Sequence, residues 1–240
     1  ESWKKPEDWY TTNVIAQVKL HDQLRRCDFL EKYIHVTTPE VYGSMNNWAS
    51  ESFNFNPSTP YAVSRAACDY HLKTFFETYK FPVVFTRSAN VYGEGQQLYR
   101  IVPRAILYGR LGKRLFLHGQ GMSERSFIHI NDVNDATYRI LLDGKQGNTY
   151  HISTTKTTSI RDLVKMVCGI IKVDFRDLVE DSKETLGKDQ SYLLKTDKIR
   201  GELGWRDSIS LDEGIRLTVE WIDNNLVTLK DLSHEYIHRQ

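Results

Sequence analysis

The sequence predicts an α/β fold in which a parallel β-sheet is covered by helices. Stretches with helical apolar spacing alternate with short stretches rich in β-branched and aromatic residues, and the connections between them are short. This alternation is typical of parallel sheets. Hydrophobic residues make up 40% of the 240 residues and charged residues 26%, which is the balance of an ordinary globular protein.

The first half of the chain supplies the clearest elements. Helices are predicted where apolar residues recur at helical spacing, strands where Val, Ile, Thr and aromatic residues cluster, and loops where Gly, Asn and Pro gather. We expect, in order, a helix at 11–25, a strand at Tyr33–Thr37, a loop at 44–60, a helix at Tyr61–Tyr79, a strand at Val83–Thr86 and a loop at Ser88–Gly95. Ligands of parallel sheets bind where such strands end.

The second half is less regular. We expect a helix around Arg104–Tyr108, a strand at Leu115–Leu117, a turn at Gly119–Gly121, a strand at Ser126–Ile130, a helix near Val133–Leu142 and a strand at Thr149–Ile152. Capping residues mark two further helices. Ser159 precedes the apolar run Ile160–Ile171, and Ser210 with Glu213 forms a capping box.

Composition makes several classes of protein less plausible. Lys and Arg number 32 and Asp and Glu 31, a net charge of +1 that gives no reason to expect nucleic acid or an anionic membrane as a partner. No apolar run approaches the length of a membrane span. The cysteines Cys27, Cys68 and Cys168 are scattered without metal or disulfide spacing, so a reducing cytoplasm is the expected location.

Tyr61 and Arg65 form the first candidate for chemistry. A free tyrosine has a pKa of about 10, and a cation four residues along the same helix favours the phenolate and lowers that pKa. Taken by spacing alone, the pair is more often a solvated helix surface than an acid/base device. Both interpretations stay open at this point.

Several segments together carry a resemblance to a known family. In order and spacing they resemble the extended short-chain dehydrogenase/reductase superfamily, and within it the NAD-dependent nucleotide-sugar epimerases and dehydratases of the dTDP-glucose 4,6-dehydratase type. The resemblance covers essentially the whole chain. The segments are Thr37–Gly43, Pro60–Arg65, Arg87–Gly93, Leu115–Gly119, Arg125–Val133 and Glu202–Trp205.

The resemblance implies a partial Rossmann-type, doubly wound parallel sheet with a smaller C-terminal α+β substrate lobe. Residues 1–94, joined by 129–153, would form the remaining NAD-binding domain, and 95–128 with 154–240 the sugar-nucleotide lobe. The family's glycine-rich dinucleotide fingerprint should precede these motifs. We therefore expect the chain to be part of a longer enzyme that has about two to three further βαβ units of about 30 residues each.

The resemblance also implies an activity, 4,6-dehydration of a nucleotide-diphosphate sugar with NAD as cofactor. C4 of the sugar is oxidised, C5 loses a proton, water leaves C6, and hydride returns to C6. The implied catalytic residues are Thr38, Glu40, Tyr61 and Arg65. The implied cofactor-binding residues are Tyr61, Arg65 and Ser88, and the implied substrate-binding residues are Asn90, Arg100, Leu117, His118 and Arg125. A homodimer through helices 11–25 and 61–79 is expected, with no metal.

Two residues depart from the family pattern. Arg65 replaces the usual lysine, and it keeps the positive charge but not the shape. Pro39 replaces an aspartate that serves as the acid for C6, and a proline has no proton to give. A decarboxylase or epimerase of the same superfamily, or a catalytically inactive sugar-nucleotide-binding homologue, therefore remains an alternative. Glu40 favours a dehydratase or decarboxylase, because 4-epimerisation needs no base at C5.

Two other motifs offer unrelated chemistry. His234–His238 matches the H-E-x-x-H pattern of zinc proteases, but it leaves no room downstream for a third ligand. Cys68 and His71 could form a nucleophilic dyad, although residues three apart on a helix are neighbours by default. A solvated tail and a packed helix are the plainer interpretations.

Overall fold

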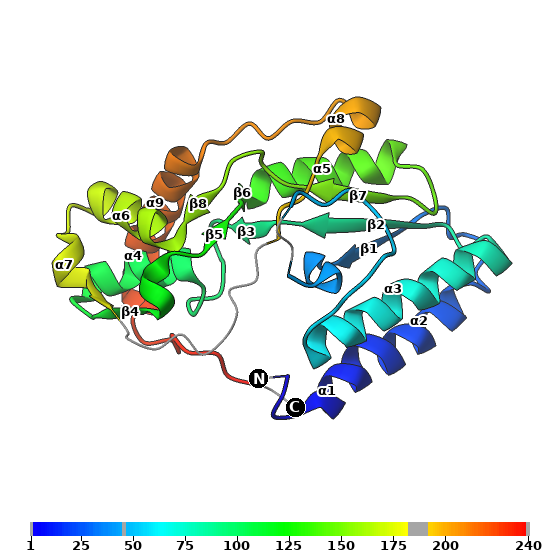
Figure 1. Ribbon diagram of the computed structural model, residues 1–240, viewed down its shortest axis with the longest axis horizontal. Helices are drawn as coiled ribbons and strands as arrows, with labels where there is room; N and C mark the ends of the chain where they lie inside the picture. Colours follow the sequence, from blue (N-terminus) through cyan, green and yellow to red (C-terminus); the bar gives the residue numbers. More distant parts are fainter. Residues whose placement is uncertain (1, 45–46, 182–191, 239–240) are drawn as a thin grey trace.

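The structure is a computed structural model that describes residues 2–44, 47–181 and 192–238. At its centre is a three-stranded parallel sheet in the order β1–β2–β7 (Figure 1). The strands are β1 (Tyr33–Thr37), β2 (Val83–Ser88) and β7 (Thr149–Ile152). Thr37 pairs with Arg87, and Arg87 with His151, so the carboxyl ends of the strands lie together.

Helices cover both faces of this sheet (Figure 1). Alternating side chains of a strand point to opposite faces, and in β2 both sets are buried. Val83 and Phe85 pack against α3 (Pro60–Tyr79), whereas Val84 packs against α5 (Ile130–Asp143). Against α3 lie α1 (Pro6–Tyr10), η1 (Thr11–Ala16) and α2 (Gln17–Leu24), and beside α5 lies α8 (Asp197–Leu203). The predicted doubly wound α/β fold is confirmed.

A second hydrophobic core is built from buried residues between Tyr92 and Leu229. Most of its apolar residues come from helices and from one short strand pair, β4 with β9, which run parallel, and Tyr92 and Phe127 also belong to it. The elements are α4 (Ile101–Leu111), β4 (Leu115–Leu117), α6 (Ile160–Ile171), α7 (Phe175–Leu178), β9 (Val179–Asp181) and α9 (Leu211–Leu229). The domain boundaries proposed above stay a prediction.

Some local predictions need correction. The helix expected at 11–25 begins at Pro6 and contains the π-helical segment η1. The loop expected at Ser88–Gly95 contains β3 (Asn90–Tyr92), which pairs in parallel with β6 (Phe127–His129). Strand β5 (Glu124–Arg125) pairs with β8 (Thr158–Ser159). The turn at 119–121 is part of η3 (His118–Gly121). These pairings depend on residues far apart in the chain, which local patterns do not reveal.

The predicted helix caps are confirmed. Ser159 Oγ accepts from Asp162 N at 2.9 Å, and Ser210 Oγ from Glu213 N at 3.2 Å. In addition, Thr59 Oγ1 accepts from Ala62 N at 3.1 Å at the start of α3, where Pro60 follows as the first helical residue. Such caps satisfy helix amides that would otherwise lack a partner. Within the described ranges, no helix has the length and apolar character needed to cross a membrane.

Candidate active site

A cavity of about 980 Å³ opens at the carboxyl ends of the central strands. That is the place where open α/β sheets bind ligands, and the volume suits a ligand of considerable size. Seven of the residues proposed from the sequence line it, and they come from six different elements or their ends: Thr38, Glu40, Tyr61, Ser88, Asn90, Arg100 and Arg125.

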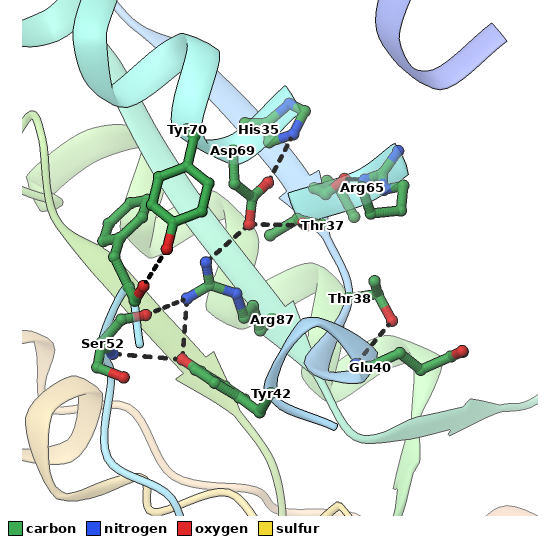
Figure 2. A network of polar contacts seen from close by, with 12 residues as sticks. His35, Thr37, Thr38, Glu40, Tyr42, Ser52, Arg65, Asp69, Tyr70 and Arg87 are labelled. Atoms are coloured by element: carbon green, nitrogen blue, oxygen red, sulfur yellow. Dashed lines mark hydrogen bonds and ion pairs between the residues drawn. The ribbon is translucent and has the colours of Figure 1, made fainter. Parts of the chain in front are cut away.

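Glu40 is presented by a short 3₁₀ helix, η2 (Pro39–Tyr42), that directly follows β1. Thr38 caps this helix, because its Oγ1 accepts from Glu40 N at 3.2 Å (Figure 2). Pro39 suits the first position, where its fixed φ is favourable and no amide hydrogen is needed. Burial raises the pKa of the Glu40 carboxyl, and the charge of Arg100 opposes this shift. A raised pKa makes the carboxylate a stronger base.

Gly43 ends this 3₁₀ helix in a conformation that favours glycine. Its φ is +74°, and a Cβ at this position would collide with the carbonyl oxygen of Asn56. A larger residue would strain the backbone three residues after Glu40.

Tyr61 lies in the first turn of α3, and its ring meets that of Trp9 edge-on at a centroid distance of 5.1 Å. Burial raises the pKa of the Tyr61 phenol, and the charge of Glu40 adds to this shift. Arg65, a hydrogen bond with Thr38 and the charge of Arg100 lower the same pKa. The expectation that Arg65 would give Tyr61 a lowered pKa is therefore wrong in its net result, since burial outweighs the cation.

Arg65 lies beside Tyr61 but outside the cavity wall formed by the described residues. Its Nη2 donates to the carbonyl oxygen of Val36 on β1. Its Nε is buried and has no hydrogen-bond partner among the described residues. One donor of the guanidinium thus remains available to a ligand.

The cavity lining also carries groups suited to an anion. Arg100 and Arg125 both line the cavity, and so does Asn90, the first residue of β3. Arg125 also donates through Nη1 to the carbonyl oxygen of Glu124 at 2.8 Å. Planar guanidinium groups match the oxygens of a pyrophosphate.

Leu117 and His118 are placed differently from the other proposed substrate-binding residues. Leu117 is buried in the second core, His118 is exposed, and neither belongs to the described cavity wall. Their proposed contacts with substrate stay a prediction.

Tyr192 lines the same cavity and was not found from the sequence. A backbone bridge between Ala49 and Leu194 places Tyr192, with Ala49 N donating to Leu193 O at 2.7 Å. Burial and the charge of Glu40 raise the pKa of its phenol, while Arg125 opposes them. No local pattern signals such a residue, because its position depends on this distant backbone pairing.

The other motifs lose their chemical interpretation. His234–His238 is not helical, and its two imidazoles have different neighbours. His238 Nε2 lies 2.9 Å from Asp8 Oδ2, whereas His234 Nε2 lies 3.4 Å from Leu229 O. No group of metal-binding side chains occurs in the part of the chain that is described.

The proposed Cys68–His71 dyad is disfavoured as well. Burial raises the pKa of the Cys68 thiol to about 12, which disfavours the nucleophilic thiolate.

Comparison with known proteins agrees with this geometry. A family model described as GDP-mannose 4,6 dehydratase matches residues 1–218. The human dTDP-D-glucose 4,6-dehydratase is 36% identical over 209 residues, which are 85% of this chain and 59% of that protein. The Haemophilus influenzae dTDP-glucose 4,6-dehydratase is 31% identical over 227 residues, covering 88% of this chain and 67% of the relative. The chain thus spans about three fifths of the human relative.

Solved structures show the same relationship. A crystal structure of dTDP-glucose 4,6-dehydratase from Streptomyces venezuelae with NAD bound superposes with a TM-score of 0.87 at 29% identity, covering 93% of this chain and 69% of that one. The residues matched by the family model include the central sheet, the cavity and most of the second core. The chain belongs to the GDP-mannose 4,6 dehydratase family, within the extended short-chain dehydrogenase/reductase superfamily.

Proposed function

We propose that this chain carries the catalytic and substrate-binding residues of an NAD-dependent nucleotide-sugar 4,6-dehydratase. One observation carries the proposal. Thr38, Glu40 and Tyr61 line the same cavity as Arg100 and Arg125, so acid/base groups and anion-binding groups face one space. The relatives named above, including the structure with NAD bound, support it.

NAD would supply the redox chemistry by accepting hydride from C4 of the sugar and returning it to C6. Tyr61, Arg65 and Ser88 are proposed to hold its nicotinamide end. The buried Nε of Arg65, which has no partner in the described part of the chain, suits a ribose hydroxyl as acceptor. This fit supports the cofactor even though Arg65 replaces the family's lysine.

Tyr61 is proposed to take the proton of the C4 hydroxyl while Thr38 donates a hydrogen bond to the same oxygen. The raised pKa of Tyr61 makes its phenolate a strong base, but that phenolate must first form. The positive charge of Arg65 favours the phenolate. Arg65 therefore acts on the protonation state of Tyr61 in this proposal.

Glu40 is proposed to act first as the base that removes the C5 proton and then as the acid for the hydroxyl that leaves C6. Once C4 is a ketone, the Glu40 carboxylate removes the C5 proton, and the electron pair of that bond forms the C5–C6 double bond. The C6–O bond breaks, and Glu40 gives its proton to the departing hydroxyl, so that water leaves. Pro39 cannot supply this proton. Glu40 would then take a proton from solvent and give it to C5 when hydride returns to C6. The raised pKa of Glu40 supports the role, because it makes the carboxylate a stronger base for the C5 proton.

The substrate is proposed to be a nucleotide-diphosphate sugar, dTDP-glucose or its CDP or UDP analogue, with its pyrophosphate on Asn90, Arg100 and Arg125. The reaction would belong to carbohydrate biosynthesis.

We further propose a cytoplasmic location, which is supported by three cysteines that are all free thiols.

The activity can be tested directly with the full-length protein, NAD and each of the three glucose nucleotides. A 4-keto-6-deoxy sugar is expected, visible by its absorbance after base is added. Tyr61→Phe should lower the rate by about 10²-fold or more, as loss of a general base does. Tyr138→Phe, which changes an exposed tyrosine of α5, is the matched control. No product from any of the three nucleotides would contradict the proposed activity.

An inactive sugar-nucleotide-binding homologue is the second candidate, favoured by Pro39 and by the place of Arg65 outside the cavity wall. Calorimetry separates the two functions. A binding homologue would take up sugar nucleotide without turnover, and Arg100→Met would abolish the uptake. Turnover with NAD would exclude this candidate.

We also propose a homodimer through the helical layer of 11–25 and 61–79. Apolar side chains on these helices are exposed, among them Ile15 at 52% and Val63 at 38%, which supports an interface there. X-ray scattering should give about twice the mass of one chain, 28.0 kDa. Ile15→Asp should give a monomer, whereas Ile237→Asp, in the exposed tail, should not. A monomeric wild type would contradict this interface.

A further inference from the structure

A buried polar network links β1, β2, β7 and α3 (Figure 2), and one of its members, Thr37, also lines the cavity. At its centre, Arg87 Nη2 donates to Asp69 Oδ2 at 2.7 Å, and both side chains are fully buried. Thr37 Oγ1 donates to the same carboxylate oxygen at 3.1 Å. His35 Nε2 lies 3.2 Å from the other oxygen, Oδ1. One carboxylate on α3 thus joins two residues of β1 to one of β2.

The other side of Arg87 reaches the segment that carries Glu40. Its Nη1 donates to the Tyr42 hydroxyl at 2.9 Å, and Tyr42 is the last residue of η2. The Tyr42 hydroxyl lies 2.8 Å from His151 Nε2. Burial, together with the charge of Arg87, lowers the pKa of His151 to about 3. The neutral imidazole therefore accepts from Tyr42 at Nε2 and donates from Nδ1 to Lys195 O, 3.2 Å away.

The network lies next to the elements that carry the cavity residues. Thr37, Arg87 and His151 are register partners on three adjacent strands. Thr37 itself lines the cavity, and Arg87 comes one residue before the cavity residue Ser88. The helix that holds Asp69 also holds Tyr61.

We propose that Asp69 and Arg87 are positioning residues that set the Glu40 segment and the Tyr61 helix relative to each other and to the end of β2. This inference rests on the proposed function. It goes beyond that function by assigning a role to two side chains that do not line the cavity. A guanidinium suits the role, because its planar fork reaches Asp69 and Tyr42 at once in fixed directions.

A purely stabilising pair would behave differently. Removing one partner of a buried ion pair destabilises a protein wherever the pair lies, so stability alone cannot test the proposal. The specific consequence is local mobility of Thr38–Tyr42, because Tyr42 loses its only charged partner among the described residues. A misplaced catalytic group lowers the rate of chemistry more than it lowers substrate affinity.

Hydrogen–deuterium exchange of the full chain tests this without depending on activity. In Arg87→Met, amides in the peptide covering residues 38–43 should exchange at least about tenfold faster, while those of α6 and α9 stay unchanged. The matched control is Arg200→Met, which breaks the partly buried pair with Asp207 and should leave residues 38–43 unchanged. Arg87→Lys keeps the charge without the fork and provides a second variant if Arg87→Met does not fold; it should show the same local effect.

Kinetics complete the test. At a temperature well below each melting point, the Arg87 variants should lose at least about tenfold in kcat with KM changed less than about threefold. Unchanged protection of residues 38–43 in a folded Arg87 variant would overturn the positioning role. A wild type that turns over no sugar nucleotide would refute the proposed function, and the exchange result would still decide the role of Arg87 and Asp69.

Discussion

At the scale of single residues, Pro39 and Arg65 distinguish this chain from the pattern it resembles. The structure gives each a local reason. Pro39 begins the 3₁₀ helix that presents Glu40, and Arg65 bonds the backbone of β1 while leaving Nε without a described partner. Neither residue disturbs the fold. Both residues affect the chemistry of the site instead. Pro39 takes the place of a proton donor, and Arg65 has a different shape from the lysine that it replaces.

Replacing Pro39 tests whether the proton donor limits the reaction. Pro39→Asp restores a carboxyl beside Glu40, and Asp is well tolerated in the first turn of a helix. Since a well-placed acid contributes about 10²–10⁴-fold, we expect kcat to rise at least about tenfold. Pro39→Asn has nearly the same shape but carries no acidic proton, and it should give no gain. Equal rates in the two variants would contradict the argument.

At the scale of elements, α3 connects stability with the site. Its first turn holds Tyr61, its middle holds Asp69, and its apolar residues pack against β2. The neighbouring segment η1 also reaches it, since Asn13 Nδ2 donates to Ser64 Oγ at 3.0 Å. The placement of Tyr61 therefore depends on how α3 begins.

The Thr59 cap supplies a test at this scale. Thr59→Ala removes the acceptor for Ala62 N and should lower the free energy of unfolding by about 1 kcal/mol in urea titrations. Ser210→Ala removes the equivalent cap of α9 and should cost about the same. Only the first should also lower kcat, because only that cap precedes Tyr61. Equal kcat values in the two variants would show that the start of α3 does not control the site.

Several of these elements could be predicted because their signals are local. Side-chain patterns within a few residues predict the strands β1, β2 and β7 and the capped helices α6 and α9. Other features could not be predicted from the sequence, because each depends on a partner that is distant in the chain. They are the pairing of β3 with β6, the short strand β9 and the position of Tyr192. Asp69 and Arg87 left a faint signal, as charges within otherwise apolar stretches, but their pairing required the fold.

At the scale of the whole molecule, buried histidines make stability depend on pH. Burial, with the nearby His35 and His71, lowers the pKa of His21 to about 3, and burial does the same for His151. Unfolded histidine has a pKa of about 6.5. Below that value the unfolded chain binds protons that the folded chain does not, so stability falls as the pH drops from about 6.5 toward 3.

The size of this effect can be measured. From pH 7 to pH 5 each such histidine should cost about 2 kcal/mol of unfolding free energy. His21→Phe keeps an aromatic ring beside Tyr33 and Phe81 and should reduce the loss over this interval by about that amount. Urea titrations at the two pH values supply the comparison. An identical loss in the variant and the wild type would contradict the assignment of His21.

The central claim is that Glu40 exchanges a proton with C5 of a nucleotide sugar in this cavity, and deuterium incorporation tests it most directly. The full chain with NAD and dTDP-, CDP- or UDP-glucose in deuterated water should give a 4-keto-6-deoxy product that carries solvent deuterium at C5, detected by mass spectrometry and NMR. Glu40→Gln should form this product at least about 10²-fold more slowly. Product from the wild type without deuterium at C5, or equal rates in Glu40→Gln, would contradict the account.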